Sequence, residues 1–151
     1  MTYARQARLS DAYELAPVLR QADLDELAAT RDTNPFHALA HPFTDPTAQT
    51  YSMIGDENEV VGMFGVNDQG AVWMLSADAL YERYRRQFMS QTLFWIDVLQ
   101  GPHPIIYNYV DTRNTRAIRW LRYCGFTVVP ETVPYGPNQM PFHLLFREKG
   151  N

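Results

Sequence analysis

The fold of this chain is decided by residues 105–126, IIYNYVDTRNTRAIRWLRYCGF. Ile105–Val110 is rich in β-branched and aromatic residues, which predicts a buried strand. After a turn, Thr115–Cys124 has helical spacing, with apolar side chains on one face and arginines on another. Gly125 stands where a helix C-cap needs a positive φ, and the apolar run that begins at Phe126 predicts another strand.

Composition limits the classes of protein to which the chain can belong. Its 151 residues, of which 46% are apolar, predict a single domain over 1–151 with a real core. A net charge of −4 disfavours nucleic acid as the main partner, because phosphate binding needs a clustered basic excess. No apolar run approaches the ~18 residues of a membrane span, and no signal peptide is visible. A single cysteine, Cys124, fits a reducing cytosol.

The N-terminal part of the chain predicts a strand, two helices and a long loop. Ser10-Asp11 is a helix N-cap signal, and Pro17 falls inside the helical pattern that follows, so we expect a kink or a late start there. Three prolines mark the loop, in which Asn34-Pro35 can start a turn of helix. The expected segments are a strand at 2–9, helices from 10 and at 23–29, and a loop at 30–48.

The middle and C-terminal parts predict more strands around one long helix. A hairpin at 50–54 and 60–66 is followed by a strand at 71–75 and a helix at 79–99, and strands at 126–133 and 142–146 enclose a turn-rich loop at 134–141. Together with residues 105–126, the order is β, α, α, β, β, β, α, β, α, β, β. This order predicts an α+β protein, close to α/β, with a mixed sheet and helices on both faces.

The unit at 105–126 also carries a family resemblance. Asn114 is followed three places on by Ala117, then by Gly125 and Phe126, as in the GNAT superfamily of N-acetyltransferases, where this pattern marks the helix beside the pantetheine arm of acetyl-CoA. Tyr-Asn-Tyr-Val-Asp and Arg-Trp-Leu make the unit look like the GNAT-like proteins of short-tailed phages, including one associated with the internal core and assembly of the virion. The resemblance implies six to seven strands, with a V-shaped splay between the fourth and fifth.

The resemblance also implies cofactor-binding residues. Leu75 and Ser76 would present backbone groups to the pantetheine, while Arg85 and Arg86 would hold the pyrophosphate. The other wall of the cofactor site would be Asn114, Ala117 and Ile118. The phosphate signature departs from the family, because Phe88 and Ser90 occupy its glycine places and residues 76–92 contain no glycine. We therefore expect weak acetyl-CoA binding or none, with the Phe88 ring either facing the pyrophosphate space or filling the core.

Two residues are candidates for acid–base work in acyl transfer. Glu26, with Asp23 beside it, lies on the helix that borders the acceptor site in the family, and a solvated acidic face is the other interpretation. The family often places a tyrosine seven residues after the asparagine, where this chain has Leu121. Tyr123 is the phenol on this helix, and it is either a substitute acid or a packed surface residue. His37 and His41 have no evident third ligand, so no metal site is predicted.

Two functions follow from these patterns. In the first, the chain is an acetyl-CoA-dependent N-acyltransferase with a degenerate phosphate loop, acting on an amine-bearing acceptor. In the second, it keeps the fold without catalysis and binds a host or phage protein, in virion core assembly or in modulation of a host factor. Fold alone does not decide between them. Both place the protein in the host cytoplasm, and neither fixes an oligomeric state.

Overall fold

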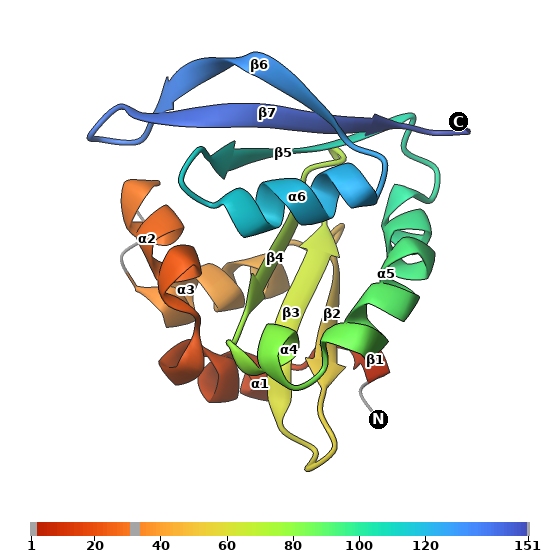
Figure 1. Cartoon of the computed structure of the whole chain (residues 1–151). Coiled ribbons are helices and arrows are strands. Elements are labelled where there is room, and N and C mark those ends of the chain that lie inside the picture. Colours follow the sequence, from red (N-terminus) through yellow and green to blue (C-terminus); the bar gives the residue numbers. More distant parts are fainter. Residues whose placement is uncertain (1–2, 31–33, 151) are drawn as a thin grey trace.

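The computed structural model describes residues 3–30 and 34–150, whose strands form two antiparallel sheets. Four strands pair in the order β1-β2-β3-β4, and three pair in the order β5-β7-β6 (Figure 1). The strands are β1 (Tyr3–Gln6), β2 (Gln49–Ile54), β3 (Val60–Val66), β4 (Val72–Ser76), β5 (Ile105–Asp111), β6 (Thr127–Tyr135) and β7 (Met140–Glu148).

The two sheets meet where β4 and β5 begin. Ala71 and Tyr107 form a parallel bridge, and the Tyr107 amide donates to the Gly70 carbonyl over 2.9 Å. Beyond this point the two strands diverge, so a V-shaped splay opens between them (Figure 1). The prediction that Ala71–Leu75 lies beside Ile105–Val110 is therefore confirmed for the first residues of each segment.

Helices cover both faces of the sheets, as the sequence predicts. They are α1 (Leu9–Leu15), α2 (Gln21–Ala29), α3 (Pro35–Ala40), α4 (Ala79–Glu82), α5 (Arg85–Gln100) and α6 (Thr115–Tyr123), with short 3-10 helices η1 (Ala16–Val18) and η2 (His41–Thr44). Two apolar clusters result. One contains Leu15, Leu39 and Met63 and joins α1 and α3 to the sheet, and the other contains Phe88, Leu121 and Leu145 and joins α5 and α6 to it.

The N-terminal region is more helical than expected. Pro17 acts as predicted, because α1 ends at Leu15 and η1 follows. The predicted loop at 30–48 contains α3 and η2. The start of α3 is fixed by the Asn34 side chain, which accepts from the His37 amide over 3.2 Å. Within the predicted strand 2–9, β1 ends at Gln6; Thr2 and residues 31–33 lie outside the described residues.

The long helix predicted at 79–99 is two helices instead. Tyr84 leaves the helical conformation, with ψ at 17°, and its ring is buried. Its hydroxyl donates to the Glu59 carboxylate over 3.1 Å and accepts from the Asp56 amide over 3.0 Å. These contacts come from the β2–β3 turn, so local periodicity could not reveal the break. Among the described residues no helix is long and apolar enough to cross a membrane.

Half of the loop predicted at 134–141 is strand. β6 continues to Tyr135 and β7 starts at Met140, so only a four-residue turn separates them. The strands extend because the Tyr135 ring packs on Tyr109 and Phe142, at centroid distances of 6.0 and 5.0 Å. Gly136, with φ at 76°, opens the turn and lies against the C-terminal end of α2.

We expect Gly136→Ala to lower the free energy of unfolding by more than about 1 kcal/mol. A side chain there would need a positive φ, and its Cβ would overlap the Ala29 carbonyl oxygen. Gly150→Ala is the matched control, because Gly150 also has a positive φ but a Cβ there meets open space. Urea unfolding of both variants measures the difference, and equal midpoints would show that the turn does not press on α2.

Candidate functional site

The splay between β4 and β5 encloses a cavity of about 530 Å³. α2 and α3 border it on one side, and the first half of α6 borders it on another. Its charged and amide side chains are Arg20, Asp23, Glu26, Asn108 and Asn114. Its aromatic side chains are Trp73, Tyr107, Tyr109, Trp120, Tyr135 and Phe142. The cavity therefore combines a small ionic cluster with a wall of rings, which is called the splay cavity below.

Helix α2 spans the open end of the splay and bonds to both arms (Figure 1). On the β4 side, the Arg20 amide donates to the Ser76 carbonyl over 2.9 Å, and the Asp23 carboxylate accepts from the Ser76 amide over 2.9 Å. On the α6 side, the Asn114 side-chain amide donates to Glu26 Oε2 over 2.8 Å. The Arg20 guanidinium joins the two sets, because it donates to Asp23 over 3.1 Å and to Asn114 over 3.4 Å.

Burial changes the acidity of both carboxyl groups on α2. Desolvation raises the pKa of Asp23 to about 6, although the Arg20 charge and the Ser76 amide oppose it. Desolvation likewise raises the pKa of Glu26 to about 7, opposed by the Asn114 hydrogen bond and assisted by the nearby charges of Asp23 and Asp111. Glu26 therefore changes charge near neutral pH, in a position that faces the splay cavity.

Some backbone groups on the edge of β4 that faces the splay are already hydrogen-bonded. The bonds from Ala77 to Val61 and from Asn67 to Ala71 show that odd-numbered residues of this segment pair with β3. The Leu75 peptide, opposite Met63, therefore points to β3, while Met74 points into the splay. Both Ser76 peptide groups are engaged by α2. Neither residue assigned to the pantetheine from the sequence thus offers it a free backbone group.

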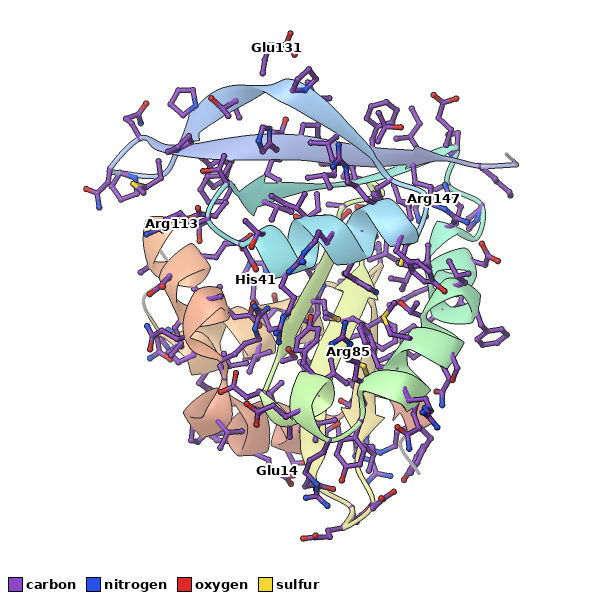
Figure 2. All side chains as sticks on the ribbon, in the orientation of Figure 1. Glu14, His41, Arg85, Arg113, Glu131 and Arg147 are labelled. Atoms are coloured by element: carbon purple, nitrogen blue, oxygen red, sulfur yellow. The ribbon has the colours of Figure 1, made fainter. Side chains whose placement is uncertain are left out.

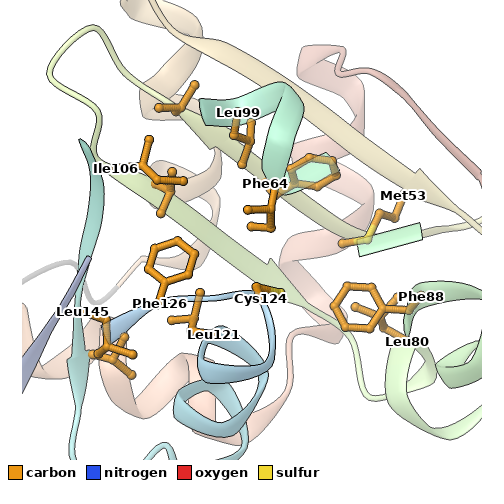
Figure 3. Packing of buried hydrophobic residues seen from close by; sticks show 14 of the residues in the cluster. Met53, Phe64, Leu80, Phe88, Leu99, Ile106, Leu121, Cys124, Phe126 and Leu145 are labelled. Atoms are coloured by element: carbon orange, nitrogen blue, oxygen red, sulfur yellow. The ribbon is translucent and has the colours of Figure 1, made fainter. Parts of the chain in front are cut away.

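The space between α5 and α6, next to the place where the resemblance puts the pyrophosphate, is filled by side chains. The Phe88 ring packs against Tyr81 and Trp120 at centroid distances of 5.8 and 5.5 Å, and Trp120 Nε1 donates to Thr92 Oγ1 over 2.8 Å. Phe88 is 6% exposed and lies in the core beside Leu80 (Figure 3), the second of its two expected placements. About 50 Å³ remains on this side, room for very few waters.

The two arginines expected to hold a pyrophosphate lie on the surface. Arg85 and Arg86 are exposed in the first turn of α5, and neither lines the splay cavity or the small space beside Phe88. Figure 2 shows Arg85 at the junction of α4 and α5. Any phosphate that they bind would therefore sit outside the molecule, without glycine backbone in the helix start behind it.

The candidate residues on α6 divide between its two ends. Asn114 and Ala117 line the splay cavity together with Glu26 and Leu75, while Ile118 packs against the core. Tyr123 is 54% exposed at the other end of the helix, where it borders a separate groove of about 330 Å³ with Leu93 and Phe146. The structure thus brings four of the candidates together and leaves Tyr123 apart from them.

Sequence reasoning missed several residues of the splay cavity. Arg20 carried no signal, because its partner Asn114 is 94 residues away in the chain. Tyr107 and Tyr109 were assigned to a buried strand, and alternation along β5 puts both rings on one face. Asp111, at the end of β5, binds the Arg113 side chain and accepts from the Arg113 amide over 2.9 Å. The Asp111 carboxylate therefore accepts the hydrogen bonds of its own turn.

Comparison with known proteins identifies the fold. No family model and no curated protein matches the sequence. A GCN5-related N-acetyltransferase from Kribbella flavida superposes with a TM-score of 0.71 at 19% identity, covering 97% of both chains. Spermidine N-acetyltransferase from Vibrio cholerae, in complex with CoA and spermine, superposes with a TM-score of 0.71 at 11% identity, covering 98% of this chain and 95% of that one.

A third structure, AAC(6')-Ib in complex with ribostamycin and coenzyme A, superposes with a TM-score of 0.69 at 16% identity over 98% of this chain and 93% of that one. All three solved structures are N-acetyltransferases or complexes with coenzyme A. At these identities the likeness establishes the GNAT fold of this chain, as the sequence predicts, and leaves its activity to be argued from its own residues.

We expect Glu26→Gln to stabilise the protein at pH 8 and to have little effect at pH 5. Because the folded pKa of about 7 lies above the ordinary value of 4.5, wild-type stability falls as pH rises between them. The substitution removes that penalty, which is on the order of 2–3 kcal/mol. Asp25→Asn on the same helix is the control, since Asp25 is exposed. Thermal unfolding at both pH values measures the effect, and equal shifts in the two variants would contradict it.

Proposed function

We propose that this chain is a non-catalytic protein of the GNAT fold that binds an amine-bearing partner through the splay cavity. One observation carries the proposal: the splay is open, whereas the space beside Phe88, next to the expected pyrophosphate site, is packed. The splay cavity holds about 530 Å³, and the space under α5 beside Phe88 and Trp120 holds about 50 Å³.

The residues present do not fit acetyl-CoA. The two β4 residues expected at its pantetheine have no free backbone group, because the Leu75 peptide pairs with β3 and the Ser76 peptide is bound by α2. Its pyrophosphate would need close backbone approach at a helix start that carries side chains throughout. We therefore derive no chemical step through this cofactor.

An amine fits the charge of the splay cavity. Among the described residues that line it are two carboxylates, Asp23 and Glu26, one guanidinium, Arg20, and the imidazole of His41. Arg20 pairs with Asp23 over 3.1 Å. Among the described side chains none forms a salt bridge with Glu26, although the charge of Arg113 lies near enough to interact with it. A buried carboxylate is costly unless it is paired, so a bound ammonium would relieve that cost. The neighbour from Vibrio cholerae was solved in complex with CoA and spermine, which supports an amine as the ligand.

For the partner, we propose a protein of a phage or of its host, met in the host cytoplasm. The support is the resemblance of residues 105–126 to the GNAT-like proteins of short-tailed phages. A role in virion core assembly or in modulating a host factor needs binding and no turnover, which agrees with the packed space beside Phe88. A lysine side chain is the natural amine of such a partner.

A second candidate function is N-acyl transfer, and one observation favours it. Glu26 has a pKa of about 7, lines the splay cavity and is oriented by the Asn114 side chain. A carboxylate with these properties is suited to taking a proton from an amine at neutral pH. This function requires the aromatic side chains between α5 and α6 to make way for a thioester.

Titration calorimetry with acetyl-CoA separates the two functions. We expect a dissociation constant above about 1 mM, at least ~4 kcal/mol weaker than a micromolar site, because the space beside Phe88 is packed. Arg86→Glu serves as the comparison variant. A micromolar dissociation constant in the wild type that is lost in Arg86→Glu would favour N-acyl transfer over the proposed function. Acetylation of an amine that Glu26→Gln abolishes and Asp25→Asn retains would do the same.

Binding of a simple amine tests the proposed function directly. We expect butylammonium, a mimic of the lysine side chain, to bind about tenfold more tightly at pH 8 than at pH 6, because Glu26 ionises around pH 7 while the amine stays charged. Tryptophan fluorescence reports it, since Trp73 and Trp120 line the cavity. Glu26→Gln should remove the pH dependence and Asp25→Asn should keep it. No binding at either pH would refute the function.

A further inference from the structure

Two tyrosine rings form a right-angled corner on the β5 wall of the splay cavity. Tyr107 and Tyr109 are two residues apart on one strand, so their side chains share a face. Their ring centroids are 6.3 Å apart and their planes meet at 84°. Tyr135, from β6, continues the wall, with its ring 6.0 Å from Tyr109 and nearly parallel to it. All three rings line the cavity.

These rings are only partly used by the core. Tyr107 and Tyr109 are half-buried, Tyr135 is 41% exposed, and none belongs to either apolar cluster. A tyrosine ring carries negative charge density on its faces and attracts cations that come within about 6 Å of its centroid. These residues therefore add aromatic surface that attracts cations to a cavity that already holds two carboxylates and one guanidinium.

The carboxylates of the cavity already accept hydrogen bonds from the protein. Asp23 receives bonds from Arg20 and from the Ser76 amide, and Glu26 receives one from Asn114. A primary ammonium has three N–H donors that need partners. An alkylated ammonium has fewer donors or none, and it keeps its full charge. An alkylated ammonium therefore suits the faces of aromatic rings better than it suits carboxylates that already accept hydrogen bonds. Glu26 can still balance the charge of the ammonium across the cavity.

We propose that the splay cavity recognises a di- or trimethylated lysine side chain of a partner protein, with Tyr107 and Tyr109 as the corner that holds the methylated ammonium. This inference rests on the proposed function and specifies its ligand. A trimethylated amine cannot accept an acyl group, so recognition is the purpose of the site. We commit to a lysine side chain rather than a lipid headgroup because the proposed function takes a protein partner.

The test compares ligands on the full chain by tryptophan fluorescence. One peptide is made with lysine or with trimethyllysine at its centre. We expect the methylated form to bind at least tenfold more tightly. Choline should likewise bind more tightly than its neutral isostere 3,3-dimethylbutan-1-ol, because the rings select charge. Equal binding of choline and the neutral isostere would overturn the cation corner.

Substitutions locate the site. Tyr107→Phe keeps the ring face and should keep the preference for the methylated peptide, whereas Tyr107→Leu should reduce it at least fivefold. Tyr109→Leu is a second variant in case the first fails to fold, as judged by circular dichroism. Tyr123→Leu is the matched control, an exposed tyrosine outside the cavity. Loss of the preference in Tyr123→Leu, or its survival in both leucine variants at Tyr107 and Tyr109, would overturn the assignment.

The remaining outcomes separate this inference from the proposed function. If the unmodified lysine peptide binds as tightly as the methylated one, the inference fails and amine binding stands. If neither peptide binds, both fail. Vesicles of phosphatidylcholine supply the same quaternary ammonium on a lipid, and we expect them not to bind. Vesicle binding without peptide binding would overturn the assignment to a protein partner.

Discussion

The hydrogen bonds from α2 to the two arms of the splay are the constraint on which the site depends. In the part of the chain that the structure describes, the two sheets share one parallel bridge, so they have little direct pairing to fix their angle. α2 supplies the missing connection, because Arg20 and Asp23 bond to Ser76 on one arm while Glu26 bonds to Asn114 on the other. The same residues set the width of the cavity and its charge, so shape and electrostatics are not independent here.

The packing between α5 and α6 is the second determinant. Side chains fill the space between α5 and α6, so that this space continues the core; they are Phe88, Trp120 and Thr92. Burying a ring of this size contributes roughly 2 kcal/mol or more, whereas a glycine there would contribute none. Stability gained on this side of the sheet therefore comes with loss of the space that a cofactor needs. The open side, by contrast, keeps polar groups whose burial costs stability.

Local patterns in the sequence predict the fold well and the site only in part. The bounds of β5 and α6 agree closely with the predicted strand Ile105–Val110 and the predicted helix Thr115–Cys124. They agree because the periodicity, the turn residues and the positive φ of Gly125 are local properties. Family spacing indicates Asn114, and the family's acceptor-side helix indicates Glu26; the contact between the two residues adds the reason for their positions. The break at Tyr84 and the place of Arg20 depend on partners far along the chain, which no periodicity contains.

The single bridge between Ala71 and Tyr107 also affects how the molecule opens. Within each sheet, ladders of hydrogen bonds protect the backbone amides from exchange with solvent. Between the sheets, the described residues make one peptide contact, and the side chains of α2 supply the other bonds. Cooperative opening units follow such boundaries. The strands β1 to β4 and the strands β5 to β7 should therefore exchange their amide protons as two blocks, with α2 belonging to both. A ligand in the splay would merge the blocks into one.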